Sequence, residues 1–162
     1  MSVSQLQQLE NIWGKAIQQG NLLFEASAFI EAGPHYMEAV IASEVLMENG
    51  TSSWKHSLRV PGMYYTSCIN MAHNYWGMQD VANAADYFLY CSYKLKMFSR
   101  KEHVSDLSKK SAFLYWLKTI KLYSEFSDQM GIPMPADMEK DDTYRQLDKL
   151  KDLFAIRKAN LN

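Results

Sequence analysis

The segment CINMAHNYWGMQDVANAADYFLYCSYKLK (residues 68–96) decides the fold. Its apolar residues recur at steps of three and four, which is the spacing of one face of an α-helix. Gly77 suits the end of a first helix, and Asp80 is a suitable N-cap for a second. The segment therefore predicts two helices joined by a short turn, which form an antiparallel helical hairpin.

Helical patterns continue toward the N-terminus. A long apolar stripe follows the N-cap candidates Ser2 and Ser4 and runs to Gly33-Pro34. Glycine favours the residue after a helix and proline the first residue of the next, so this dipeptide predicts a helix boundary. The second helix then runs from about residue 34 to Asn49-Gly50, and its apolar periodicity predicts an inner face of Tyr36, Ala39, Val40, Ser43, Leu46 and Met47.

Helical patterns also continue toward the C-terminus. We expect a helix from about residue 105 to 130, a break at the prolines of residues 131–135, and a sixth helix from about residue 137. No segment alternates with period two, so no sheet is expected. The prediction is an all-α single domain (residues 1–162) of about six helices, as three stacked antiparallel hairpins at approximately residues 4–49, 61–98 and 105–160.

The composition narrows the classes of function. With a net charge of −1, the chain lacks the basic excess that nucleic-acid binding requires. No apolar run approaches the roughly 20 residues of a membrane span. The N-terminus shows no basic segment leading into an apolar stretch, so we expect a cytoplasmic protein without a secretory signal.

The sequence contains no recognisable motif for catalysis or metal binding. Cys68 and Cys91 have no CxxC spacing, and free buried thiols are expected. No two histidines share a helical face at i, i+4, and no phosphate-binding glycine loop or GxSxG element occurs. We therefore expect no catalysis, no metal and no cofactor.

The hairpin at residues 68–96 also carries a repeat signature. Small Ala72 and aromatic Tyr75 mark its first helix, and the small residue Ala84 follows Ala72 at i+12. This pattern resembles a tetratricopeptide repeat. Gly20 and Phe24 with Ala39 resemble a second repeat, in which the two small residues are separated by i+19. Ala112 and Tyr115 keep the small–aromatic spacing in the third hairpin, so the resemblance covers most of the chain.

The resemblance implies a right-handed superhelix with a concave groove lined by the first helix of each pair. The groove residues that it implies are Gln18, Asn21, Thr66, Asn70, His73, Trp76 and Lys110. Some tetratricopeptide proteins hold a partner's C-terminal carboxylate with Asn and Lys side chains. Asn21, Asn70 and Lys110 match such positions, whereas Ile17 and Asp106 stand where that clamp carries lysines.

Three tyrosines point to a further surface. Tyr87, Tyr90 and Tyr93 step by three along one predicted helix, which cannot bury them together with Ala84 and Phe88. Tyrosine is enriched where proteins meet partners. The three rings therefore either form an aromatic interface or pack against a neighbouring helix.

These observations predict a protein–protein interaction module. It would be a small cytoplasmic adaptor or chaperone-like protein that binds a peptide or helix of a partner in its groove, without catalysis. One alternative is a structural homo-oligomer, such as a homodimer, that uses the tyrosine surface. Another is a small-ligand or enzyme pocket near His73, with Cys68 and Trp76 beside it.

Overall fold

The structure, a computed structural model, describes residues 1–49 and 57–135. Its elements are α1 (Val3–Glu25), α2 (Phe29–Asn49), the short 3-10 helix η1 (Ser57–Arg59), α3 (Val60–Gly77), α4 (Val81–Ser99) and α5 (Asp106–Met130). The described residues contain no strand, which confirms the all-α prediction. The expected sixth helix lies outside these residues. The chain divides into two compact units, Met1–Tyr123 and Ser124–Asn162, and the sites described below lie in the first.

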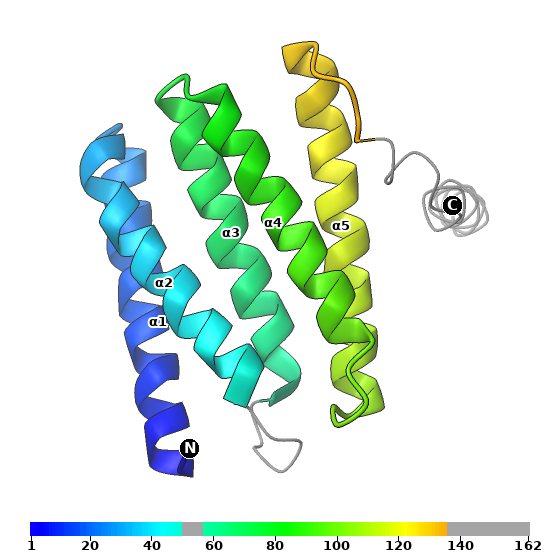
Figure 1. The fold of residues 1–162 in the computed structure, drawn as a ribbon. Helices are drawn as coiled ribbons and strands as arrows, with labels where there is room; N and C mark the ends of the chain where they lie inside the picture. The colour runs from blue at the N-terminus through cyan, green and yellow to red at the C-terminus, as the bar shows by residue number, and fades with distance from the viewer. Residues whose placement is uncertain (50–56, 136–162) are drawn as a thin grey trace, which may run out of the picture. The chain divides into compact units, whose positions relative to one another are not determined.

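Two helical hairpins share one geometry. The antiparallel pairs α1–α2 and α3–α4 are visible in Figure 1. In the first turn, the backbone N–H groups of residues 26, 27 and 28 donate to the carbonyls of residues 22, 24 and 23. In the second turn, residues 78, 79 and 80 donate to residues 74, 76 and 75. The two hairpins therefore form an internal repeat, in which residue 26 of the first corresponds to residue 78 of the second.

The backbone conformation of the two turns agrees with this correspondence. Ser27 and Gln79 are the only described residues other than glycine with positive φ, at 58° and 61°. Each occupies the middle of its turn, where a left-handed residue reverses the chain. Asp80 caps α4 by accepting from the Asn83 N–H, as the sequence predicts.

The predicted helix boundary at Gly33-Pro34 is wrong. Both residues lie inside α2, and the boundary falls at residues 26–28. Pro34 is the sixth residue of α2, where its missing N–H removes one backbone hydrogen bond from the helix. With the corrected boundary, the buried Ala32 takes the place assigned to Ala39, and it follows Gly20 at i+12.

Large side chains are buried where helices meet. The face of α2 expected to be internal is buried: Tyr36, Ala39, Val40, Ser43, Leu46 and Met47. Small residues permit the close approach that this packing needs. A Cβ atom added at Gly20 would lie 2.6 Å from Tyr36 Cε1, and one added at Gly77 would lie 2.7 Å from Phe29 Cε1.

Hydrogen bonds from two tryptophan side chains join neighbouring helices. The Trp13 indole N–H on α1 donates to Ser67 Oγ on α3 at 2.8 Å. The Trp116 indole N–H on α5 donates to Ser92 Oγ on α4 at 3.1 Å. Each indole thereby satisfies its only donor on a neighbouring helix. Across residues 1–49 and 57–135, no helix is long and apolar enough to cross a membrane.

Candidate functional site

A small pocket lies where α1 and α3 run beside each other. It has a volume of about 240 Å³ and is lined by Asn21, Phe24, Glu25, Tyr36, Asn70 and His73. Three of these residues, Asn21, Asn70 and His73, are groove residues predicted from the sequence. The structure therefore brings together predicted side chains from two different hairpins.

Hydrogen bonds order the amides in this pocket. The Tyr36 hydroxyl donates to Asn21 Oδ1 at 3.0 Å, and Asn70 Nδ2 donates to the same oxygen at 3.1 Å. Burial, with a contribution from the charge of Glu25, raises the pKa of Tyr36 to about 12. The Tyr36 hydroxyl therefore stays protonated and remains a donor at neutral pH. The shared acceptor fixes the position of Asn21 relative to Asn70.

His73 forms an aromatic wall of the pocket. Its ring lies 6.2 Å from the Trp76 ring and 6.1 Å from the Phe88 ring, measured between centroids. Burial lowers the pKa of His73, so the imidazole is neutral at physiological pH. His73 occupies the position of Asn21 in the internal repeat, so both hairpins present a polar side chain there.

The other predicted groove residues lie elsewhere on their helices. Gln18 is exposed on α1, whereas Thr66 and Trp76 are half-buried on α3, and none of them lines the pocket. Lys110 is exposed near the start of α5 and does not line it either. The carboxylate clamp implied by the family resemblance therefore lacks a cation in this pocket, and Glu25 places a negative charge there.

The two cysteines are buried and free on α3 and α4. Burial raises the pKa of the Cys68 thiol well above its usual value, so Cys68 is a weak nucleophile at neutral pH. Neither cysteine lines the pocket beside His73. Within the described part of the chain, no three His, Cys, Asp or Glu side chains are placed to hold a metal ion.

A second and larger groove lies between α2 and α4. Its volume is about 670 Å³, and its lining includes all three tyrosines of the predicted aromatic interface, Tyr87, Tyr90 and Tyr93. The rings differ in exposure. Tyr87 stacks on Tyr75 with centroids 5.6 Å apart, whereas Tyr93 is 60% exposed. Part of the tyrosine set therefore packs internally and part faces the solvent.

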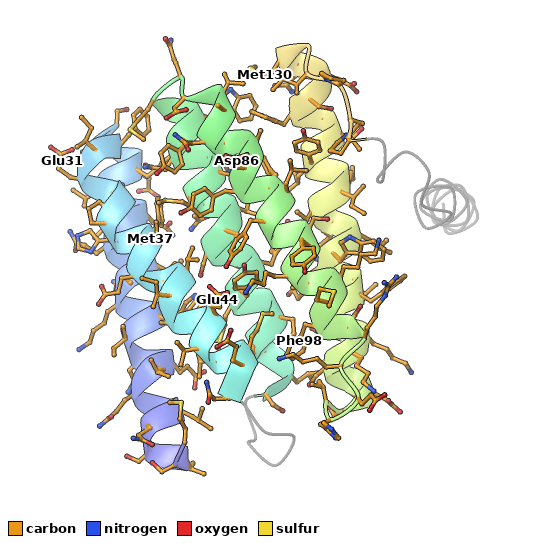
Figure 2. The ribbon with its side chains drawn as sticks, in the orientation of Figure 1. Glu31, Met37, Glu44, Asp86, Phe98 and Met130 are labelled. Atoms are coloured by element: carbon orange, nitrogen blue, oxygen red, sulfur yellow. The ribbon has the colours of Figure 1, made fainter. Side chains whose placement is uncertain are left out.

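A polar cluster at this groove is not predicted from the sequence. The Glu44 carboxylate accepts from the Tyr90 hydroxyl at 2.8 Å and forms an ion pair with the Lys94 ammonium. Glu44 lies on α2 and Lys94 lies far along the chain on α4, so no local motif joins them. Glu44 and Met37 are labelled on α2, and Asp86 on α4, in Figure 2.

Ionisation of Glu44 depends on these contacts. Burial opposes the charge, but the hydrogen bonds from Lys94 and Tyr90 and the charge of Lys94 outweigh it and lower the pKa of Glu44. The hydrogen bond to Glu44 raises the pKa of Lys94. The side chains of Lys94 and Glu44 are 30% and 23% exposed, so solvent screens the pair only in part.

The lowered pKa of Glu44 predicts a pH-dependent contribution to stability. Below its folded pKa the carboxylate is protonated, so the stabilisation is present above the unfolded pKa and is lost as the pH falls. We expect Glu44→Gln to lower the free energy of unfolding by about 1–2 kcal/mol near neutral pH. The difference from wild type should shrink toward zero in acid, as measured by urea unfolding at several pH values.

Glu48→Gln is the matched control, because Glu48 is exposed one turn further along α2. This variant should stay within about 0.5 kcal/mol of wild type at every pH. A stability difference for Glu44→Gln that is the same in acid and at neutral pH would show that ionisation of Glu44 plays no part.

Comparisons with known proteins give one match. No curated protein and no solved structure matches the chain. The pattern of one family, described as "Protein of unknown function (DUF2753)", matches residues 11–136. This span includes most of α1 and all of α2 to α5. It also includes the pocket between α1 and α3 and the groove between α2 and α4. Because the match covers more than half of the sequence, the chain belongs to the DUF2753 family.

Proposed function

We propose that the protein is a tetratricopeptide-like interaction module that binds a peptide segment of a partner in the groove between α1 and α3. It would act as a small cytoplasmic adaptor or chaperone-like protein, without catalysis. The observation that carries the proposal is the convergence of Asn21, Asn70 and His73 on one pocket. Two buried free cysteines are in keeping with a reducing compartment.

The internal repeat supports the tetratricopeptide-like part of the proposal. In the corrected register, Gly20, Ala32, Tyr36 and Ala39 of the first hairpin correspond to Ala72, Ala84, Phe88 and Cys91 of the second. In each hairpin, the small residue of the second helix follows the small residue of the first helix by 12 residues. The family resemblance rests on this separation. Stacked hairpins of this kind present their first helices as one binding surface.

The chemistry of the pocket favours a peptide backbone over a free carboxylate. Asn21 Oδ1 already accepts two hydrogen bonds, but its amide N–H groups and Asn70 Oδ1 make no bond with the described residues. A donor and an acceptor side by side complement the C=O and N–H groups of a peptide chain. A carboxylate would meet Glu25 without a cation in the lining.

The test is affinity capture from extract of the source cells with three immobilised proteins. Wild type should retain a defined set of proteins, and an Asn21→Ala/Asn70→Ala variant should lose part of that set by mass spectrometry. A Gln8→Ala/Asn11→Ala variant is the control, because it removes exposed amides from α1 outside the pocket. Retention of the same proteins by all three would remove the proposed groove function.

A further inference from the structure

The groove between α2 and α4 is a second surface, and its walls come from the second helix of each hairpin. We propose that it binds a basic amphipathic helix of a partner protein. Its inner lining is apolar and includes Met37, Val40 and Leu89. Two further apolar side chains on its walls face the solvent, Ile41 with 56% and Tyr93 with 60% of their surface exposed. Such apolar patches with polar edges mark interaction sites.

The negative charges on the walls of the groove favour a positively charged partner. Helix α2 carries four glutamates and no lysine or arginine. Glu48 lies one turn from Glu44 and two turns from Ile41, so it shares their face. On the opposite wall, α4 contributes the exposed carboxylate of Asp86. An apolar groove with acidic edges complements a helix whose apolar strip is flanked by Lys or Arg.

The protein's own Lys94 shows how this surface receives a cation. Its ammonium lies 5.4 Å from the centroid of the Tyr90 ring and pairs with the Glu44 carboxylate. An aromatic face beside a carboxylate stabilises an ammonium by cation–π attraction and by charge. Tyr90 and Tyr93 follow Asp86 by one and two helical turns, so a carboxylate and two aromatic rings lie along one face of α4.

The dimensions of the groove suit a helix. On α4 the lining runs from Asn83 to Tyr93, which spans about 15 Å at the helical rise per residue. A partner helix of about three turns would cover this length. Its apolar residues at i, i+3 or i+4, and i+7 would lie along the groove, in the manner of helix-in-groove recognition.

The experiment uses the full chain and two synthetic helical peptides of about 18 residues, or five turns. Both peptides carry the same Leu and Ala face; one has Lys at its polar positions and the other has Glu. By fluorescence anisotropy, the Lys peptide should bind at least about tenfold more tightly than the Glu peptide. Ile41→Lys should weaken binding of the Lys peptide by about tenfold or more, and added salt should weaken it too.

Matched variants separate this groove from other surfaces. Leu114 on α5 is 58% exposed, and Leu114→Lys should leave binding of the Lys peptide unchanged. The Asn21→Ala/Asn70→Ala variant should also bind it normally, so failure of the α1–α3 site is distinguishable. Circular dichroism should show that each variant retains the helix content and thermal transition of wild type.

Three results would overturn the proposal. The two peptides could bind with equal affinity, which would show that charge plays no part. Leu114→Lys could weaken binding as much as Ile41→Lys, which would show that the peptide does not select the groove. Sedimentation could show a dimer that Ile41→Lys converts to a monomer, which would identify a second copy of this chain as the occupant.

Discussion

Phe88→Ala should lower the free energy of unfolding by about 3–5 kcal/mol, the usual cost of removing a buried aromatic ring. Phe88 is 1% exposed on α4. Its ring lies between His73 on α3 and Tyr123 on α5, with centroid distances of 6.1 and 6.2 Å. Truncation would leave a cavity among three helices, which the rigid helical backbones cannot close. Urea unfolding followed by circular dichroism measures the effect.

The control for this prediction is Tyr93→Ala on the same helix. Tyr93 is mostly exposed, so its loss should change the free energy of unfolding by less than about 0.5 kcal/mol. If Phe88→Ala proved as mild as Tyr93→Ala, the Phe88 ring would not be packed between α3 and α5.

Gly20→Ala and Gly14→Ala should have effects of opposite sign on the same helix. Alanine is favoured over glycine inside a helix by about 1 kcal/mol, and this gain applies at both positions. At Gly14 an added Cβ atom has no neighbour within 4 Å, so the variant should be more stable than wild type. At Gly20 it would lie 2.6 Å from Tyr36 Cε1, and overpacking of about 1–3 kcal/mol should exceed the gain.

Tyr36 cannot easily make room for the added methyl group. It is 2% exposed, and its hydroxyl is held by Asn21. Thermal unfolding of the two variants under identical conditions tests the pair. Equal stabilisation of both would mean that α1 and α2 lie further apart at Gly20 than in this structure.

Part of the fold follows from local sequence. Asp80 can cap a helix and Gly77 can end one, so both ends of the α3–α4 turn are readable from nearby residues. The internal face of α2 follows from the periodicity of its apolar residues, and all six predicted members are buried. These predictions succeed because caps and amphipathic faces depend on residues within one or two turns.

The boundary between α1 and α2 could not be read in the same way. Gly33-Pro34 has the local appearance of a boundary but lies inside a helix, and the turn at Ser27 has neither glycine nor proline. The positive φ of Ser27 is imposed where two packed helices must reverse direction. Its counterpart Gln79 marks the same turn in the second hairpin, so the correspondence between the hairpins was the one signal that could have located it.

Some residues of the candidate sites are also predicted from the sequence, whereas others depend on how the helices pack. The resemblance to tetratricopeptide repeats implies Asn21, Asn70 and His73 as groove residues, and all three line one pocket. Glu44 and Lys94 were missed, because their pairing depends on how α2 packs beside α4. The same resemblance implies Lys110 as a groove residue, but it does not line the pocket.

The sequence by itself determined that the described residues are all-α, the extent of α3, α4 and α5, and the buried face of α2. These features depend on hydrogen bonds and apolar spacing within single helices. The tertiary structure alone decided where the first hairpin turns and which of the tyrosines are covered. It also decided that a groove with an apolar lining and acidic edges forms between α2 and α4. Each of these features depends on contacts between residues in different helices, far apart along the chain, which no local pattern specifies.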